Sequence, residues 1–160
     1  MSRYRLYLDS SVVGWSLNQG HPERCAEANR LLRQIAAGSF VGAYSWVMVA
    51  EINDAPRRVR QRLWRKVKEA HLRQVPPKLK HDAHELATTY CARGIVPPDF
   101  VADARHIAIA TLWNADALVS YNFEHIVNLD TMVEVNRVNR ELGRAEVFLC
   151  QTKEVIVHEG

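Results

Sequence analysis

The fold is decided by the stretch Tyr4-Arg5-Leu6-Tyr7-Leu8-Asp9-Ser10-Ser11-Val12-Val13. Its apolar first half predicts a short buried strand, and the acid with two hydroxyl residues that follows predicts the carboxyl end of that strand. In open α/β sheets, ligands bind at this edge. Because a buried carboxylate is costly without compensation, Asp9 predicts a bound metal ion, provided that the rest of the chain supplies further ligands.

The composition is that of an ordinary globular protein. The chain has 160 residues, of which 48% are hydrophobic and 24% charged, with a formal charge of +3, which suits a single domain spanning residues 1–160. Cys25, Cys91 and Cys150 are far apart and predict reduced thiols in place of a zinc site. The sequence shows no apolar run of about 20 residues and no signal-peptide pattern, which predicts a cytoplasmic protein without a membrane partner.

Apolar runs alternate with amphipathic helical patterns along the chain. Strands are expected at 4–8, 40–44, 117–120 and 145–150. Helices are expected around 28–37, 46–55, 57–73, 79–93, 97–113 and 132–142, and glycines stand at three of the expected stops, Gly38, Gly94 and Gly143. This alternation predicts an α/β fold with a central, mainly parallel sheet flanked by helices.

Two further acids lie in apolar surroundings, Glu51 in the second expected helix and Asp103 in the fifth. Clustered carboxylates repel one another, and a divalent cation relieves that repulsion. Oxygen ligands favour Mg²⁺ or Mn²⁺ over zinc. Asp9 and Asp103 are therefore the expected primary metal ligands, and Glu51 is expected to bind metal or to orient the attacking water.

Supporting roles are expected for four more residues. Ser10 or Ser11 would hydrogen-bond a carboxylate or a phosphate. His106 shares a helix face with Asp103 and would assist nearby. Asp99 would lie on the same face if the helix extends back to it.

Each acid also has a simpler explanation. Asp9 can cap the turn that follows it, and Glu51 can pair with an arginine such as Arg105. Asp103 and Asp99 can complement a helix N-terminus, and a single histidine on a helix is more often packed than catalytic. The order of the acids on an α/β pattern favours the metal site.

The segment 57–74 is strongly basic, because it contains eight of the chain's 21 Lys and Arg residues and one acid, Glu69. Such a segment can neutralise phosphates, and Trp64 can stack on a base or belong to the core. A solvated helix face is the commoner role of a charge run, but the imbalance favours RNA or an acidic partner. The residues expected to contact RNA are Arg57, Arg58, Arg62, Arg65 and Lys66.

Four segments in this order carry a resemblance to a known family: YLDSSV at 7–12, VAEI at 49–52, ADARHIA at 102–108 and ADALVSYNFEHIVN at 115–128. Together they resemble the PIN-domain ribonucleases, which include the VapC-type toxins of toxin–antitoxin systems. The resemblance implies a parallel sheet flanked by helices and an acidic pocket that binds one or two divalent ions. It also implies hydrolysis of RNA phosphodiester bonds, a small antitoxin partner and a homodimer.

Asp9, Glu51 and Asp103 match the family's acidic positions. The next family acid commonly follows the Leu-Val-Ser/Thr strand, where this chain has Asn122, with Glu124 two residues further on. Asparagine keeps an oxygen ligand but loses a negative charge. Asn122 is therefore expected to be an outer or weak ligand that weakens one metal position or leaves a single-metal site.

The favoured function is a Mg²⁺- or Mn²⁺-dependent endoribonuclease that is the toxin of a toxin–antitoxin pair. The alternative, which Asn122 motivates, is a catalytically weak or inactive PIN-fold module that binds RNA or a protein. An aspartyl-phosphate phosphatase or a receiver-like domain would also place an Asp after the first strand. Phosphatases of that kind need a second Asp where this chain has Ser11, and a Walker A loop is absent.

Overall fold

The computed structural model describes residues 3–156, and its centre is a five-stranded sheet with the strand order β3-β2-β1-β4-β5. Every strand pairing in this sheet is parallel. The strands are β1 (Arg5–Leu8), β2 (Val41–Tyr44), β3 (Arg73–Gln74), β4 (Ala117–Val119) and β5 (Phe148–Cys150). The expected α/β fold with a parallel central sheet is confirmed.

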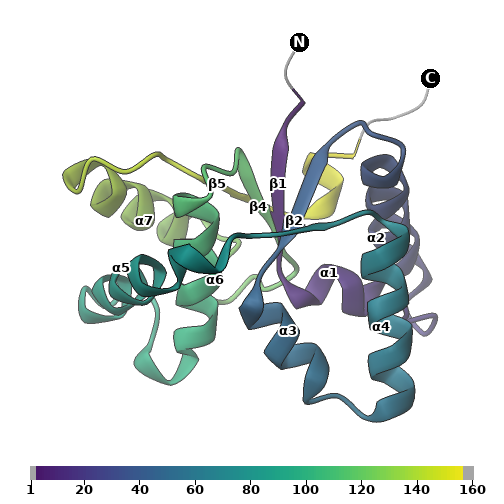
Figure 1. Ribbon diagram of the computed structural model, residues 1–160. Coiled ribbons are helices and arrows are strands. Elements are labelled where there is room, and N and C mark those ends of the chain that lie inside the picture. The colour runs from purple at the N-terminus through teal and green to yellow at the C-terminus, as the bar shows by residue number, and fades with distance from the viewer. Residues whose placement is uncertain (1–2, 157–160) are drawn as a thin grey trace.

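Helices cover both faces of the sheet (Figure 1). The α-helices in the described range are α1 (Ser10–Trp15), α2 (Pro22–Ala36), α3 (Trp46–Asn53), α4 (Arg57–Glu69), α5 (Lys80–Ala92), α6 (Val101–Leu112) and α7 (Leu129–Glu141). The 3₁₀ turns are η1 (Pro77–Leu79), η2 (Pro98–Phe100) and η3 (Thr152–Glu154). Among the helices of residues 3–156, none has the length and apolar character that crossing a bilayer requires.

Successive residues of β1 serve two separate cores. Leu6 and Leu8 pack against residues of α1, α2, α3 and α4, whereas Tyr7 packs against residues of α5, α6 and α7. Because side chains alternate along a strand and both faces of β1 are covered, the strand reads as a continuous apolar run. The side chains of β4 also alternate between the two cores. Leu118 lies in the same core as Tyr7, and Val119 lies in the same core as Leu8.

Two elements were missed from the sequence. Helix α1 has six residues, fewer than two helical turns, so the apolar periodicity cannot reveal it. Strand β3 has two exposed polar residues and pairs with Ala43 and Tyr44 at the edge of the sheet. The basic helix, expected to reach residue 73, ends at Glu69, because His71 has a positive φ of 56° and turns the chain toward this edge.

Several boundaries also differ from the expected ones. Pro98–Phe100 is a 3₁₀ turn, so α6 begins at Val101 and Asp99 lies outside the α-helix. Helix α7 begins at Leu129, before the expected residue 132, because the Asn128 side chain accepts a hydrogen bond from the backbone N–H of Thr131 at 2.8 Å. The final strand is limited to β5. The stops at Gly38, Gly94 and Gly143 are confirmed, because all three glycines have a positive φ, and the three cysteines are free.

Candidate functional site

The carboxyl ends of β1 and β4 lie side by side at the point where the strand order reverses. β1 pairs with β2 on one side and with β4 on the other, and Leu8 is in register with Val119. The next residues of the two strands are Asp9 and Ser120. In open α/β sheets such a switch point is where ligands bind, so the structure puts Asp9 at the expected edge.

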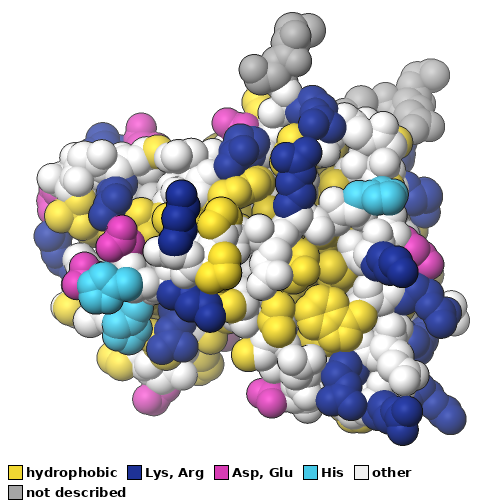
Figure 2. Space-filling view, in the orientation of Figure 1, with side chains coloured by type: hydrophobic (Ala, Val, Ile, Leu, Met, Phe, Trp, Pro, Cys, Tyr) yellow, Lys and Arg dark blue, Asp and Glu magenta, His cyan; other side chains and the backbone are white. Residues whose placement is uncertain are grey.

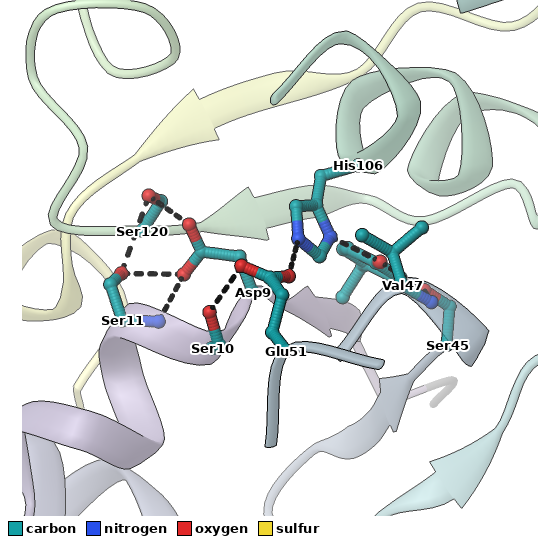
Figure 3. A network of polar contacts seen from close by, with 9 residues as sticks. Asp9, Ser10, Ser11, Ser45, Val47, Glu51, His106 and Ser120 are labelled. Carbon is teal, nitrogen blue, oxygen red and sulfur yellow. Dashed lines mark hydrogen bonds and ion pairs between the residues drawn. The ribbon is translucent and has the colours of Figure 1, made fainter. Parts of the chain in front are cut away.

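The Asp9 carboxylate is buried, with 4% of the residue exposed. Its Oδ1 accepts hydrogen bonds from the backbone N–H and the hydroxyl of Ser11 at 3.1 and 2.5 Å, and its Oδ2 accepts one from the Ser120 hydroxyl at 2.6 Å (Figure 3). The bond to the Ser11 N–H makes Asp9 the N-cap of α1, so the capping role that the sequence left open is real. Burial raises the pKa of Asp9 above its ordinary value, although the positive charge of His106 and the serine bonds lower it.

A second group of polar contacts joins α3, α6 and β1 beside Asp9 (Figure 3). Oε1 of Glu51 lies 2.7 Å from Nε2 of His106, and its Oε2 accepts a hydrogen bond from the Ser10 hydroxyl at 3.0 Å. The imidazole is 2% exposed, and its Nδ1 lies 2.6 Å from the Tyr7 hydroxyl. That hydroxyl lies 2.7 Å from Oγ of Ser45, the N-cap of the helix that carries Glu51.

Glu51 and His106 favour each other's charged form. Burial lowers the pKa of His106, but the hydrogen bond and charge of Glu51, with the charges of Asp9 and Asp103, raise it above its ordinary value. Burial alone would raise the pKa of Glu51, yet the hydrogen bond and charge of His106 and the bond from Ser10 leave it below its ordinary value. The charges of all three acids predicted from the sequence therefore favour the charged form of one buried imidazole.

Asp103 has a histidine partner of its own. Its Oδ2 lies 3.0 Å from Nδ1 of His125, and the His125 ring packs against the exposed ring of Phe100, with 4.2 Å between the centroids. Oδ1 of Asn122 accepts a hydrogen bond from the backbone N–H of His125 at 3.0 Å, so this oxygen stabilises the turn that carries His125. Glu124 is 83% exposed, and its Oε1 lies 3.6 Å from Nε2 of His125.

The side chains as placed do not bring the three acids around one point. In residues 3–156, the group whose ligand atoms all lie within 4.8 Å of one another is the exposed set on α5, His81, Asp82 and Glu85. Glu51 and Asp103 are instead bound to His106 and His125. The donor set still suits a hard cation, because it offers carboxylate and hydroxyl oxygens and a buried carboxylate that needs compensation.

Four residues of the candidate site and the basic groove are not among those predicted from the sequence. Ser120 directly follows strand β4 as Asp9 directly follows β1, and this shared position is a signal that the sequence contains. The buried Tyr7 hydroxyl needs a partner, which is a weaker signal. No sequence pattern pairs His125 with Asp103, which is 22 residues away, or brings Arg33 of α2 beside the basic helix. The alternative pairing of Glu51 with Arg105 is replaced by the pairing with His106.

The basic helix forms one wall of a groove against α2. The groove has a cavity of about 570 Å³, and Arg62, Arg65 and Lys66 line it together with Arg33. Figure 2 shows Lys and Arg side chains gathered over α4, at the lower right of the view. Lys66 donates a hydrogen bond to Oδ1 of Asn29 at 2.7 Å, which ties α4 to α2.

The groove begins one short helix away from the acids. Ser16, directly after α1, lines it, and α1 extends for about 9 Å from the Asp9 end. Arg57 and Arg58 lie exposed in the first turn of α4 and are not among the lining residues. Trp64 is partly buried against the core and meets the Tyr44 ring edge-on, which favours the core role that the sequence left open.

We expect the substitution His106→Gln to flatten the pH dependence of stability in the metal-free protein. Because the folded pKa of His106 lies above its ordinary value of 6.5, its contribution is fully present below that value and is lost as the pH rises through the folded pKa. The wild-type Tm, measured with a chelator present, should therefore fall as the pH rises above 6.5, and the His106→Gln Tm should fall less.

The matched control is His81→Gln, which removes an exposed histidine paired with Glu85 on α5. This variant should keep the wild-type profile. A His106→Gln profile that follows the wild-type curve over the same pH range would contradict the assignment of the charged pair.

No protein-family model matches the chain, and no curated protein sequence matches it. Solved structures do match, among them a chain of the crystal structure of VapBC2 from Rickettsia felis bound to a DNA fragment from their promoter. That match has a TM-score of 0.58 and 16% sequence identity, and it covers 92% of this chain and 98% of the other. The likeness shows the fold, and it confirms the PIN-like, VapC-like fold that the resemblance implied.

Proposed function

We propose that this chain, whose fold is PIN-like, is a Mg²⁺- or Mn²⁺-dependent endoribonuclease. One observation carries the proposal: the buried carboxylate of Asp9 stands at the switch point of the sheet, next to Ser10, whose hydroxyl holds Glu51 together with His106. An acidic site at this position is where an open α/β sheet binds its ligand.

The acids and their partners have different roles in the proposed reaction. Asp9 and Asp103 would hold the cation, and Glu51 would bind it or accept a proton from the attacking water. His106 fixes the Glu51 carboxylate from the buried side. Asn122 would be an outer ligand, although its Oδ1 accepts a hydrogen bond from the backbone N–H of His125. A bound divalent cation supplies charge neutralisation for the phosphate and lowers the pKa of water.

Hydroxyl groups orient these carboxylates. Ser11 and Ser120 hold the two oxygens of Asp9, and Ser10 holds Oε2 of Glu51. Asp99 lies exposed in η2, next to the start of α6, where it adds negative charge near Asp103.

The basic groove would bind the RNA strand. Arg62, Arg65 and Lys66 place three positive charges along one wall, and each can neutralise a phosphate. Arg57 and Arg58 extend the positive surface toward the start of α4. A strand that lies in this groove would run along α1 to the acids.

We also propose that the protein is a cytoplasmic toxin with a small antitoxin partner, and that it forms a homodimer. One of the matching solved structures is of VapBC2, which supports an antitoxin partner. A second copy of the chain would need an exposed apolar surface to pack against. In the described chain, α1, α2 and α3 carry no exposed large apolar side chain, whereas Leu129 and Val133 on α7 are exposed. Sedimentation of the purified chain would test the dimer.

The direct test of the activity is cleavage of a 5′-labelled single-stranded RNA. The wild-type protein should cut with Mg²⁺ or Mn²⁺, stop when EDTA is added and resume when the metal is restored. The variant Asp103→Asn, purified in parallel, controls for a contaminating nuclease. Equal cleavage by the variant and the wild type would refute the proposal.

A second candidate function is a PIN-fold module that binds RNA without cutting it. It is favoured by the contacts of Glu51 and Asp103 with His106 and His125, which give both carboxylates a partner within the protein. A ligand that binds the folded state raises the Tm. Addition of Mg²⁺ or Mn²⁺ without any rise in Tm would favour this candidate.

A further inference from the structure

An arginine is held over three aromatic rings between the acids and the basic groove. The guanidinium carbon of Arg24, in the first turns of α2, lies 5.0 Å from the ring centroid of Trp15, 5.6 Å from that of Tyr121 and 5.4 Å from that of Phe123. We call these four residues the Arg24 cluster. Cation–π contacts of this kind hold a guanidinium in place and leave its N–H groups available.

The Arg24 cluster is joined to the candidate site by hydrogen bonds. The backbone N–H of Tyr121 donates to Oγ of Ser11 at 2.9 Å, and the same hydroxyl donates to Asp9. Phe123 directly follows Asn122. At the other end, Trp15 is the last residue of α1, and the basic groove begins at Ser16. The Arg24 cluster is therefore linked to Asp9 on one side and adjoins the start of the groove on the other.

Two members of the cluster have free surface for a ligand. Phe123 is 39% exposed, and Arg24 is exposed and forms no ion pair with a carboxylate of residues 3–156. Tyr121 is buried, and its hydroxyl bonds to Thr152, so its ring is held in place beneath Arg24. An exposed ring stacks on a base, and a guanidinium without a carboxylate suits a phosphate.

We propose that the Arg24 cluster is a nucleotide subsite that binds one unpaired nucleotide next to the scissile phosphodiester, with its base on Phe123 and its phosphate on Arg24. This inference rests on the proposed function and adds a binding position for one nucleotide. A base inside a duplex is paired and stacked on its neighbours, whereas a single strand can turn a base onto a protein ring. This subsite should therefore bind an unpaired nucleotide and gain nothing from a duplex.

The test compares RNA binding by variants in an Asp103→Asn background, which removes cleavage. Fluorescence anisotropy would measure binding of a labelled single-stranded RNA and of the same RNA annealed to its complement. Phe123→Leu keeps the apolar bulk and removes the aromatic face, so single-strand binding should weaken about 5- to 150-fold while duplex binding stays unchanged. Phe123→Trp should bind the single strand as the parent does.

The control is Phe148→Leu. Phe148 is an exposed phenylalanine that pairs with Ala117 at the opposite end of the sheet, and its substitution should change neither affinity. A 2-aminopurine base in the single strand adds a direct readout of stacking. Its fluorescence should be quenched by the parent and by Phe123→Trp, but not by Phe123→Leu, and the Tm of each variant checks its folding.

Unchanged single-strand affinity and unchanged quenching in a folded Phe123→Leu variant would overturn the subsite and leave the proposed function intact. Equal weakening of single-strand and duplex binding would also overturn it. A parent that binds neither RNA, together with a wild-type protein that cuts none, would overturn the proposed function and the subsite together.

Discussion

The substitution Asp9→Asn should abolish metal-dependent RNA cleavage and at the same time stabilise the metal-free protein. Asparagine keeps the shape of the side chain but removes the negative charge that would hold the cation. Loss of an outer partner of a metal ligand already costs about 10- to 100-fold in affinity or activity, so loss of a ligand charge should cost at least about 100-fold in cleavage rate.

The gain in stability follows from the burial of Asp9. Because burial raises the folded pKa of this carboxyl above its ordinary value of 3.8, its favourable contribution is present below that value and is lost as the pH rises through the folded pKa. At neutral pH the ionised carboxylate therefore lowers the free energy of unfolding. In EDTA at pH 7, the Tm of Asp9→Asn should exceed that of the wild type by about 2–4 °C for each kcal/mol relieved.

With Mn²⁺ in place of EDTA, the Tm of the wild type should exceed that of Asp9→Asn, because a ligand raises the Tm of the protein that binds it. The matched control is Asp116→Asn. Asp116 is exposed at the opposite end of the sheet and accepts a hydrogen bond from the backbone N–H of Arg5 at 2.7 Å. This variant should keep full cleavage and gain no stability. An Asp9→Asn variant that cuts RNA at the wild-type rate would contradict the assignment of Asp9.

The second large effect is expected in the basic groove. We expect the triple substitution Arg62→Gln, Arg65→Gln and Lys66→Gln to weaken RNA binding and its salt dependence together. For single strands each neutralised phosphate contributes about 0.7 to the slope of log K against log salt, so the slope should fall by about 2. If affinity at 1 M salt is unchanged, this corresponds to about 50-fold weaker binding at 0.15 M salt.

A second triple variant removes the same charge elsewhere. Its positions are Arg93, Arg137 and Arg140, exposed residues of α7 and the end of α5 that pair with Glu141, Glu134 and Glu146. Substituting all three with Gln should leave the affinity and slope of RNA binding near the wild-type values. Similar losses in both triple variants would mean that net charge, and not the groove, attracts RNA.

The sequence predicts the frame of the site because that frame depends on local patterns. The continuous apolar run at Leu6, Tyr7 and Leu8 identifies a strand buried on both faces, and Asp9 directly after it marks the ligand edge. Glu51 and Asp103 stand out because each interrupts an apolar helix. These patterns can be recognised in the sequence without knowing which side chains are in contact in the folded protein.

The partners of the acids could not be predicted, because they depend on tertiary contacts. His106 lies 55 residues from Glu51, and nothing in the spacing favours His106 over Arg105, its neighbour on α6. Whether Asn122 binds a cation or stabilises a turn also depends on the path of the chain after β4. The Arg24 cluster joins residues from three segments of the chain and carries no local pattern.

Titration of the metal-free protein with Mn²⁺ by calorimetry measures whether the acids at the switch point hold a divalent cation, without interference from contaminating nucleases. The comparison uses the wild type, Asp9→Asn, and Asp82→Asn, which disrupts the exposed acidic set on α5. We expect a Mn²⁺ site that is lost in Asp9→Asn and kept in Asp82→Asn. Wild-type Mn²⁺ binding in Asp9→Asn would contradict this expectation.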